Sequence, residues 1–379
     1  MNIGIDARVL ENKMSGIGRY LLDILKGISL YDSENKYTLF STREILSTYK
    51  QDFQLNNFTL VNSGNKIVPS KLFSPFWLNF VLPKLIEENK IDVFFSPNNL
   101  LPAKKLKSKS IITVHDIFHL INKKYHPFFY RIYLNFQLPI SIKNSDSIIT
   151  ISETSKNDLI RFFKIDPEKI KVFYRAANPK FKPLKLSSEE INRLKKKLIL
   201  PEKFLLFVGV IENRKNIIGI LRIADILFNR RQDVKFLLVG KPGHGFKEIY
   251  SEIIRRKNVI YLSYIEEEDI VSIYNLAFLF IFPSFYEGFG IPPIEAMACS
   301  CPVIASNVSS IPEVCGDAAL YFDPSNINDM ESKITKTILD DTLRKDLIQK
   351  GLNNVTRFSG EYFSDGLNKI INSLTNENQ

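Results

Sequence analysis

Short apolar runs recur along the whole chain, separated by longer segments that repeat apolar residues every three or four positions. Runs of this length suit buried strands, and the longer segments suit amphipathic helices that cover a sheet. Regular alternation of the two is typical of a parallel sheet with crossover helices. In the first half we expect strands at Asn2–Ala7, Tyr37–Ser41, Phe58–Val61, Val93–Ser96, Ser110–Val114, Ser147–Ile151 and Lys171–Tyr174. Helices are expected at Gly18–Ser29, Phe128–Lys143 and Glu153–Phe163, the last with Ser152 as its N-cap.

The same alternation restarts after an irregular segment, 175–188, which contains Pro179 and Pro183 and is expected to be a linker. The pattern then predicts strands at Phe204–Val208, Val234–Val239, Val259–Tyr261, Phe278–Phe282 and Val303–Ala305, followed by helices from Asn326 through Leu374. The prediction is an α/β protein whose two doubly wound domains, residues 1–180 and 181–360, face each other across a cleft. Ligands bind outside the carboxyl ends of the strands in such sheets, so the cleft is the expected site.

Composition narrows the class of protein. The 379 residues are 45% hydrophobic and 24% charged, which is typical of folded domains rather than disordered chains. The longest apolar stretch, Leu276–Phe282, is far shorter than the roughly 20 residues of a membrane-spanning helix. Asp6 and Arg8 would interrupt a secretion signal, so we expect a cytoplasmic protein. Three cysteines, Cys299, Cys301 and Cys315, fit neither a disulfide framework nor a paired zinc motif.

The net charge of +10 is confined to the first half of the chain. Residues 1–180 carry 26 Lys and Arg against 16 Asp and Glu, whereas residues 181–379 carry 25 of each kind. Such asymmetry suggests an anionic partner for the first half, such as a phospholipid surface, a pyrophosphate-bearing lipid or nucleic acid. An equally weighted interpretation is that lysine-rich loops only keep the protein soluble.

The most specific local motif runs from Phe282 to Ala298, from a strand through a glycine turn into a helix. Its glycines, Gly288 and Gly290, allow backbone to approach a ligand, and the helix amino end behind them attracts anions. Glu287 lies in the loop and Glu295 is expected in the first helical turn, so both carboxylates can face one ligand of nucleotide-sugar size. Carboxylates accept hydrogen bonds from pairs of hydroxyl groups. Taken singly, each could equally be an ordinary turn or helix-start charge.

Two further turns carry candidate anion-binding groups. Arg214 and Lys215 follow the strand that ends near Val208, where they could compensate the charge of a leaving diphosphate. Gly16 and Gly18 lie in the first strand-to-helix connection, although their spacing does not match the full dinucleotide fingerprint. The segment Gly240–Gly245 also follows a strand, but lacks the ending of a phosphate loop and is interpreted first as a turn.

His115 directly follows a predicted strand and is expected to line the cleft as a hydrogen-bonding group, with Asp116 orienting its ring. His119 is four positions further on, but no third ligand stands out, so a metal site is not favoured. The chain also contains no Asp-any-Asp triplet of the kind that holds a divalent ion on a diphosphate. Arginine, lysine and a helix dipole would therefore replace the metal.

With these motifs, the chain resembles the family 4 retaining glycosyltransferases over nearly its whole length. The family's Glu, seven residues, Glu motif is matched by Glu287 and Glu295, with Gly288, Phe289, Gly290 and Ile291 between them. The resemblance implies that this segment binds the donor, that Glu295 holds its ribose and that Glu287 contacts the transferred sugar. It also implies diphosphate binding by Lys215 and Arg214, a close backbone approach at Gly16 and Gly18, and a sugar contact by His115. The fold it implies has two facing Rossmann-like domains, called GT-B, and a last helix, within 361–379, that crosses back to the first domain.

Three positions depart from the family pattern. Val210 stands where many members have arginine after the first strand of the second domain, and Arg175-Ala176 replaces an Asn-Gly pair. Gly360 stands where a tryptophan is frequent. These departures affect the assignment of the donor more than the assignment of the fold.

The residues of these motifs most resemble those of bacterial mannosyltransferases and deoxyhexosyltransferases. These enzymes assemble O-antigen and other surface polysaccharides and use GDP-linked sugars. The expected reaction is metal-independent, cofactor-free hexose transfer with retention to a saccharide or lipid-pyrophosphate-linked acceptor. Lys104, Lys105, Lys107, Lys109, Lys123 and Lys124, with the aromatic stretch 125–133, could dock on the inner face of the cytoplasmic membrane; an ordinary solvated loop is the alternative. Rival functions are a nucleotide-sugar epimerase or phosphorylase on the same scaffold. A nucleic-acid-binding protein is disfavoured because no recognised reading motif accompanies the charge.

Overall fold

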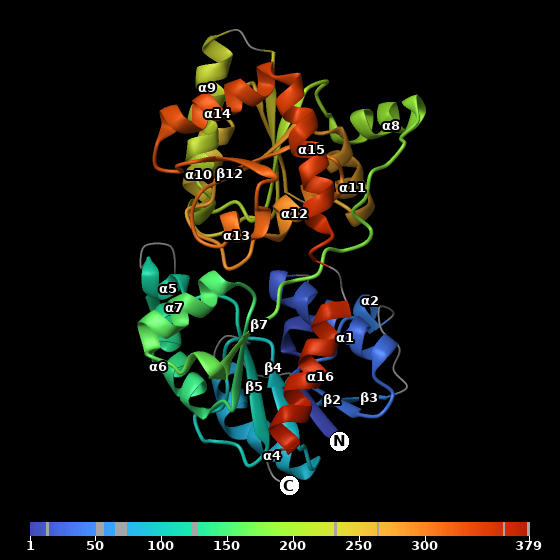
Figure 1. Cartoon of the computed structure of the whole chain (residues 1–379), viewed down its shortest axis with the longest axis vertical. Coiled ribbons are helices and arrows are strands. Elements are labelled where there is room, and N and C mark those ends of the chain that lie inside the picture. Colours follow the sequence, from blue (N-terminus) through green and yellow to red (C-terminus); the bar gives the residue numbers. More distant parts are fainter. Residues whose placement is uncertain are drawn as a thin grey trace. The chain divides into compact units, whose positions relative to one another are not determined.

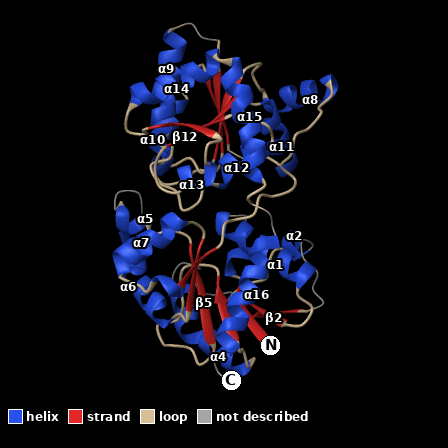
Figure 2. Cartoon of the chain, in the orientation of Figure 1, coloured by secondary structure: helices blue, strands red, loops and turns tan. Residues whose placement is uncertain are grey.

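The computed structural model describes residues 1–12, 15–50, 57–64, 74–122, 128–230, 233–263, 265–358 and 361–376. The chain divides into two compact units (Figure 1). Unit 1 takes the described residues of 1–121, 128–176 and 360–379, and unit 2 those of 122–127 and 177–359. Each unit has a central parallel sheet flanked by helices (Figure 2).

The sheet of unit 1 has seven parallel strands in the order β3-β2-β1-β4-β5-β6-β7. Its strands are β1 (Asn2–Asp6), β2 (Lys36–Ser41), β3 (Phe58–Asn62), β4 (Val93–Ser96), β5 (Lys109–Val114), β6 (Ser147–Thr150) and β7 (Ile170–Val172). Its helical segments are η1 (Arg8–Leu10), α1 (Gly16–Tyr31), α2 (Ser47–Lys50), η2 (Trp77–Val81), α4 (Leu82–Glu88), α5 (Phe118–Ile121), α6 (Phe128–Asn144), α7 (Glu153–Phe163), η4 (Pro167–Lys169) and α16 (Glu361–Asn376). The last helix, α16, packs on α1.

The sheet of unit 2 has six parallel strands in the order β10-β9-β8-β11-β12-β13. Its strands are β8 (Phe204–Val208), β9 (Lys235–Val239), β10 (Val259–Leu262), β11 (Leu279–Phe282), β12 (Val303–Ser306) and β13 (Ala319–Phe322). Its helical segments are α8 (Ser188–Leu198), η5 (Asn213–Lys215), α9 (Ile217–Asn229), α10 (Phe246–Ile253), α11 (Glu267–Leu276), α12 (Ile291–Ala298), α13 (Ile311–Cys315), α14 (Ile327–Leu339) and α15 (Asp341–Val355).

The predicted alternation of strands and helices is confirmed, including Ser152, whose hydroxyl accepts a hydrogen bond from the Ser155 N–H at the start of α7. Strand β4 shows why apolar runs predict these strands, because all four of its residues are buried. Helices cover both faces of such a sheet, so neither face stays polar. The expected linker, 175–188, contains no helix or strand before α8 begins at Ser188.

Strand β13 and helix α1 differ from the sequence prediction, and strand β7 ends at Val172 rather than at Tyr174. Strand β13 was not expected, because its sequence, Ala-Leu-Tyr-Phe, is short and leaves Leu320 and Tyr321 only half-buried. Helix α1 begins at Gly16 rather than at Gly18, because the Ser15 hydroxyl accepts a hydrogen bond from the Gly18 N–H and so caps the helix two residues earlier.

The strand orders fix where a ligand can bind. In each sheet the chain order reverses once, between β1 and β4 in unit 1 and between β8 and β11 in unit 2. At such a reversal the two connections leave in opposite directions and open a crevice at the carboxyl ends of the strands. No helix of the described residues has the length and apolar character needed to span a bilayer.

Candidate active site

The carboxyl ends of β8 and β11 lie side by side at the reversal in the unit 2 sheet. The chain leaves β8 through a turn that ends in η5, which carries Arg214 and Lys215. It leaves β11 through the loop that carries Glu287. Three of the predicted site residues therefore lie where this fold class binds its ligands.

Arg214, Lys215 and Glu287 form one ion cluster. Lys215 Nζ lies 2.5 Å from Glu287 Oε1, and Arg214 Nη1 lies 3.0 Å from Glu287 Oε2. Only 7% of Lys215 and 6% of Glu287 are exposed, so this pairing takes place largely out of water. The sequence placed these residues at one site but did not indicate that the carboxylate pairs with both cations.

Charge attraction keeps the Glu287 carboxylate ionised. Burial acts to raise the pKa of its carboxyl group, but Arg214 and Lys215 outweigh burial and lower that pKa to about 2. Burial also lowers the pKa of the Lys215 ammonium, against the attraction of Glu287. The carboxylate is therefore charged throughout the neutral range and is too weak a base to take up a proton there.

Glu212 completes the cluster, and sequence reasoning missed it although it lies two residues before Arg214. Its Oε1 accepts hydrogen bonds from Arg214 Nε at 3.0 Å and from Arg214 Nη2 at 2.9 Å. Arg214 Nη1 also donates to the backbone carbonyl of Tyr286. Two carboxylates thus balance the two cations, and the formal charge of the cluster is zero.

The segment Gly240–Gly245 supports the turn that carries Arg214. The Ile211 N–H donates to the Lys241 carbonyl, and the Gly243 N–H donates to the Ile211 carbonyl. Gly240 has a φ of +151°, and a Cβ there would lie 1.8 Å from the Gly209 carbonyl oxygen. Only glycine can occupy a position with so little room. The close approach of this segment therefore holds the turn that carries Arg214 in place.

Two serines after β12 hold the Glu287 loop, and neither was predicted. The Ser309 hydroxyl accepts a hydrogen bond from the Glu287 N–H at 2.9 Å. The buried Ser310 hydroxyl lies 2.9 Å from the carbonyl oxygens of both Glu287 and Phe289, to which it donates. These bonds set the direction in which the Glu287 side chain leaves the backbone.

The predicted donor-binding segment, residues 288–291, leads directly into α12. Gly290 has a φ of +101° and precedes the first helical residue, Ile291. Pro292 and Pro293 follow in the first turn, where proline loses no helical hydrogen bond. Because these prolines have no N–H, Gly290 and Ile291 supply the backbone donors that lead into the helix.

Glu295 lies beyond the first turn of α12, so its predicted position is wrong by one turn. The helix begins at Ile291, and its first turn contains no acidic residue. Glu295 instead accepts a hydrogen bond at Oε2 from the hydroxyl of Tyr274, at 3.0 Å. Tyr274 is fully buried on α11, and burial together with Glu295 raises the pKa of its hydroxyl group. Tyr274 therefore donates its proton to the carboxylate and fixes the Glu295 rotamer.

Gly16 and Gly18, in unit 1, serve different purposes at the start of α1. The Gly18 N–H donates to the Ser15 hydroxyl at 3.0 Å, so this amide is used by the helix cap. Gly16 is exposed, and a Cβ there would meet nothing within 4 Å. Open space beside Gly16 leaves its backbone accessible to a ligand.

His115 follows β5 at the carboxyl end of the unit 1 sheet. Its Nε2 lies 2.8 Å from the Pro97 carbonyl oxygen, which can only accept, so Nε2 carries the hydrogen. Burial, aided by the charge of Arg175, lowers the pKa of the ring to about 4, against the carbonyl bond. The neutral ring therefore has an acceptor at Nδ1. Asp116 was expected to orient this ring but instead accepts a hydrogen bond from the Phe118 N–H.

Arg175, a departure from the family pattern, can be placed, whereas part of the predicted docking segment cannot. Arg175 follows β7 in unit 1, with its side chain 10% exposed and 3.9 Å from Asp23. It thus supplies a cation at the carboxyl end of the sheet where the family pattern has Asn-Gly. Lys123 and Lys124 lie outside the described residues, as do 125–127 and the side chains of 128–130.

Two family models match the chain, one for each half. The model described as Glycosyltransferase Family 4 matches residues 14–181, and the model described as Glycosyl transferases group 1 matches residues 188–354. The second match contains Arg214, Lys215, Glu287 and Glu295. The first contains Gly16, Gly18 and His115.

Relatives and solved structures agree with these matches. The chain is 28% identical to the O-antigen chain mannosyltransferase B of Escherichia coli, over 95% of this chain and 97% of that protein. It is 29% identical to the serotype-specific mannosyltransferase WbdA of Escherichia coli, over 72% of this chain but only 35% of that longer protein.

Among solved structures, Anabaena HepE in complex with UDP and glucose has a TM-score of 0.74 and 18% identity, with 98% of this chain and 99% of that chain covered. This likeness confirms the predicted fold. The chain is a glycosyltransferase of the GT-B fold, in which a Glycosyltransferase Family 4 half precedes a glycosyl transferases group 1 half.

Proposed function

We propose that this glycosyltransferase moves mannose, or a related deoxyhexose, from a GDP-sugar to a hydroxyl group of a saccharide or lipid-pyrophosphate-linked saccharide. The anomeric configuration is retained, and the product belongs to a cell-surface polysaccharide such as the O-antigen. The names of the two mannosyltransferase relatives support the sugar and the process. A nucleoside-diphosphate-sugar donor is supported by the likeness to a fold seen with UDP and glucose, and the GDP base by the resemblance of the motifs to those of mannosyltransferases.

The observation that carries this proposal is the cluster of Arg214, Lys215 and Glu287 at the strand-order reversal of unit 2. In hexose transfer, the bond from the anomeric carbon to the diphosphate breaks as a bond to the acceptor oxygen forms. Negative charge grows on the leaving diphosphate and positive charge on the sugar ring. In one water-poor site, fixed cations stabilise the negative charge on the diphosphate, and a fixed carboxylate stabilises the positive charge on the sugar ring.

Donor binding requires an exchange of partners in this cluster. Its formal charge is zero, so it attracts a diphosphate only if the phosphate oxygens take over hydrogen bonds that Glu287 now accepts. Lys215 and Arg214 then bind the diphosphate, and the released Glu287 carboxylate turns to the sugar. Guanidinium and ammonium groups both bind phosphate strongly, so this exchange needs no metal ion and no cofactor.

Glu287 is fully ionised in the ligand-free cluster, where Arg214 and Lys215 lower its carboxyl pKa to about 2. Retention follows if the acceptor attacks on the face from which the diphosphate departs. The acceptor proton then passes to an oxygen of the departing diphosphate, on the same face of the sugar. Glu287 acts by binding the sugar and stabilising the positive charge that develops on its ring.

The remaining predicted residues bind the donor. Glu295, held by Tyr274, accepts hydrogen bonds from the ribose hydroxyls. Residues 288–291 approach the donor through backbone, and Gly16, with Gly18 maintaining the helix start, does so from the other half of the chain. His115 accepts a hydrogen bond from a sugar hydroxyl at Nδ1.

A direct test measures both binding and transfer. Thermal unfolding is recorded with GDP-, UDP- and ADP-sugars, because a ligand that binds only the folded state raises its apparent stability. GDP-mannose should raise the midpoint most, and the acceptor-dependent product should keep the α-configuration in its NMR spectrum. Donor turnover without acceptor would favour an epimerase, and a preference for UDP- or ADP-sugars would overturn the donor assignment.

The proposed acceptor also bears on where the enzyme acts in the cell. A lipid-pyrophosphate-linked acceptor would place the enzyme at the inner face of the cytoplasmic membrane. The excess of positive charge in residues 1–180 supports attachment to an anionic surface. Transfer to a water-soluble saccharide acceptor does not require this attachment, so the two can be tested separately.

A further inference from the structure

His115 is fixed at its backbone by two neighbouring connections. Its N–H donates to Asn99 Oδ1 at 3.1 Å, and its carbonyl oxygen accepts a hydrogen bond from the Ser155 hydroxyl group at 2.9 Å. Asn99 lies in the loop after β4, and Ser155 lies on α7, which follows β6. Because β4 and β6 are the neighbours of β5 in the sheet, the residue that follows β5 is held from both sides.

The imidazole ring of His115 is held as well. Its Nε2 donates to the Pro97 carbonyl oxygen at one edge of the ring. Tyr20, on α1, packs against the ring in an edge-to-face arrangement, with ring centroids 4.8 Å apart and an angle of 82° between the planes. The hydroxyl group of Tyr20 lies 2.9 Å from Thr113 Oγ1, so the aromatic ring is itself held in place. These contacts leave Nδ1 with one direction in which to accept a hydrogen bond.

Asn99 adopts a backbone conformation that suits this contact. Its φ of +53° lies in the left-handed region, which asparagine occupies more readily than most residues. Its backbone N–H donates to the Thr113 carbonyl oxygen at 2.9 Å. Asn99 therefore joins its loop to the end of β5 twice, through its backbone at Thr113 and through its side chain at His115.

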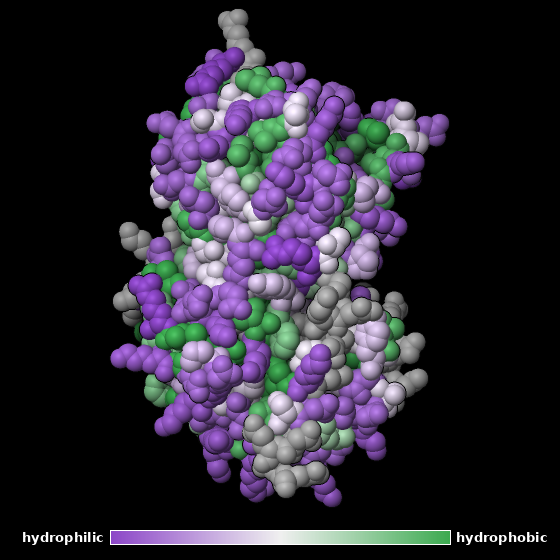
Figure 3. Space-filling model, in the orientation of Figure 1, coloured by the Kyte–Doolittle hydropathy of each residue, from purple (hydrophilic) through white to green (hydrophobic). Residues whose placement is uncertain are grey.

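Two polar side chains of α6 lie in the interior of unit 1. Hydrophilic side chains predominate on the face of the molecule seen in Figure 3, whereas Gln137 and Ser141 are only 2% and 0% exposed. A buried polar group is costly unless it is hydrogen-bonded, and an apolar side chain would fill the same space without that cost. The hydrogen bonds of these two side chains therefore indicate which part of the fold they hold.

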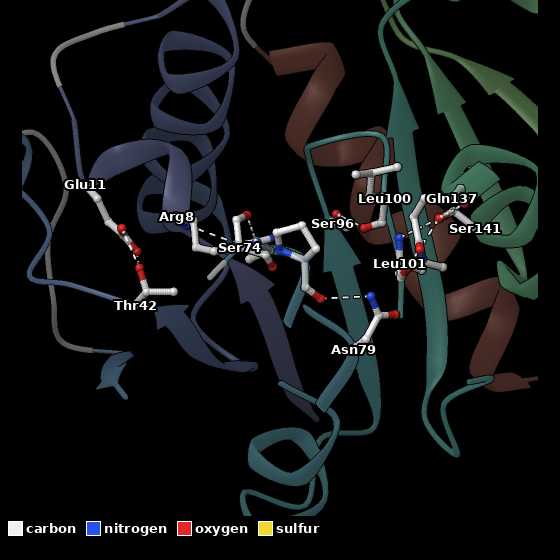
Figure 4. Close-up of polar contacts among 12 residues, drawn as sticks. Arg8, Glu11, Thr42, Ser74, Asn79, Ser96, Leu100, Leu101, Gln137 and Ser141 are labelled. Carbon is white, nitrogen blue, oxygen red and sulfur yellow. Dashed lines mark hydrogen bonds and ion pairs between the residues drawn. The ribbon is translucent and has the colours of Figure 1, made fainter. Parts of the chain in front are cut away.

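Gln137 and Ser141 both bind the loop that follows β4 (Figure 4). Gln137 Nε2 donates to the Leu101 carbonyl oxygen at 2.7 Å, and Ser141 Oγ accepts from the Leu101 N–H at 2.9 Å. At the other end of the loop, Ser96 Oγ donates to the Leu100 carbonyl oxygen at 2.8 Å. The loop is thus anchored on both β4 and α6, and it offers its polar groups to the end of β5 from a fixed position.

We propose that Asn99 and Tyr20 are positioning residues that hold the His115 ring so that Nδ1 presents a fixed acceptor to a hydroxyl group of the transferred sugar. They have the role that the sequence suggested for Asp116. An acceptor fixed before the donor arrives loses no rotamer freedom on binding, so its hydrogen bond to the sugar contributes more to affinity. This inference rests on the proposed function, because it requires that His115 contacts the sugar.

N99G tests the side chain of Asn99 while keeping its backbone, because glycine adopts a positive φ without strain. It removes the acceptor for the His115 N–H, and kcat/KM for the donor should fall about fivefold, the contribution of one hydrogen bond. N99D keeps an acceptor oxygen and should recover most of this loss at pH 8, where imidazole is neutral. K164G is the matched control, since Lys164 has a φ of +52° in the same unit but is exposed. Its kcat/KM should equal that of the wild type.

Tyr20 is tested by two substitutions of different severity. Y20F keeps the ring against His115 and removes only the hydroxyl group, so it should have the smaller effect on kcat/KM. Y20L also removes the edge-to-face contact and should lower kcat/KM about fivefold. Thermal unfolding of each variant verifies that the assay measures folded protein.

Nitrogen NMR of the imidazole provides a readout that a purely structural role would not change. In the ligand-free wild type, His115 should appear as one neutral tautomer with its hydrogen on Nε2. H115A identifies the signals of this ring among those of the four histidines. N99G and Y20L should show both tautomers or broadened signals, because the ring then exchanges between orientations, and N99D should restore the single form.

The outcomes separate this inference from the proposed function. Wild-type kcat/KM in N99G and Y20L, or an unchanged single tautomer in both, would overturn the positioning role, and the proposed sugar contact would stand if H115A still lowered kcat/KM. Wild-type kcat/KM in H115A would instead refute the sugar contact, and the inference would fail with it. Equal losses in N99G and K164G would also overturn the inference, because the added glycine rather than the lost contact would then cause the effect.

Discussion

Lys215 and Glu287 are 72 residues apart in the sequence and form a buried ion pair with Nζ 2.5 Å from Oε1. The pair joins the turn after β8 to the loop after β11, which are adjacent strands of the unit 2 sheet. Arg214 and Glu212 extend it into a cluster of zero formal charge. This contact is the one that our proposal expects to open when a diphosphate binds.

Removing one member of this pair should destabilise the protein more than removing both. K215M leaves the buried Glu287 carboxylate with only Arg214 to balance its charge, and E287Q leaves the buried Lys215 ammonium without its carboxylate partner. Breaking a buried pair costs about 3 to 5 kcal/mol, whereas replacing both charges is often nearly neutral. Chemical unfolding of the single variants and of K215M/E287Q measures this difference. Additive losses in the double variant would show that the two side chains do not interact.

Tyr274 should act on the donor only through Glu295. Y274F keeps the buried ring but removes the hydrogen bond to Glu295 Oε2, so the carboxylate loses its fixed position. We expect the KM for the donor to rise about five- to tenfold, which corresponds to about 1 kcal/mol for one hydrogen bond, with a smaller change in kcat. E295Q should have the larger effect. An unchanged donor KM in Y274F would exclude this positioning role.

Gly16 should matter for binding and not for folding. An alanine Cβ at position 16 would meet nothing within 4 Å, and alanine favours a helix more than glycine by up to about 1 kcal/mol. G16A should therefore unfold at the same temperature as the wild type or slightly higher, yet bind GDP-mannose more weakly. G240A is the contrasting variant, since its Cβ would collide with the Gly209 carbonyl and destabilise the fold. Normal donor affinity in G16A would remove Gly16 from the site.

His115 should make stability depend on pH in a defined window. Its folded-state pKa of about 4 lies below the ordinary value of 6.5, so the unfolded chain binds more protons between these values. The contribution of His115 to the free energy of unfolding is fully present above pH 6.5 and is lost as the pH falls towards 4. The loss amounts to about 2 kcal/mol from pH 7 to pH 5. Unfolding of H115N should vary less over this range. A parallel pH dependence in both proteins would contradict a neutral imidazole at position 115.

Glu287 makes a test with the same sign at lower pH. Its folded-state pKa of about 2 lies below the ordinary 4.5, so its stabilisation is present above pH 4.5 and decreases as the pH falls towards 2. This window lies largely below that of His115. The difference between wild type and H115N at pH 5 to 7 therefore reports on the histidine alone.

Much of the fold was predictable because the strands are short and buried on both faces. The runs in β4 and β11 are buried throughout, which leaves a clear signal in a single sequence. Strand β13 gave no comparable signal, since two of its four residues are only half-buried at the edge of the sheet. Local caps such as Ser152 were predictable because donor and acceptor are close in the sequence.

Parts of the candidate site could not be predicted because they depend on contacts between distant residues. The motif indicated Glu287 and Glu295, but their partners Lys215 and Tyr274 lie 72 and 21 residues away. Ser309 and Ser310, which hold the Glu287 loop, come from the connection after β12 and have no motif of their own. Glu295 was placed one turn too early because the prolines suggested a later helix start than Ile291.

Calorimetric titration of GDP into the wild type and into K215M/E287Q tests the central claim most directly. The double variant removes the paired charges together and should remain folded, which its thermal unfolding verifies. If the diphosphate takes over the bonds of Lys215, GDP should bind the double variant about 10- to 100-fold more weakly, the amount expected for one charge-assisted hydrogen bond. Equal affinity of the two folded proteins for GDP would contradict the account.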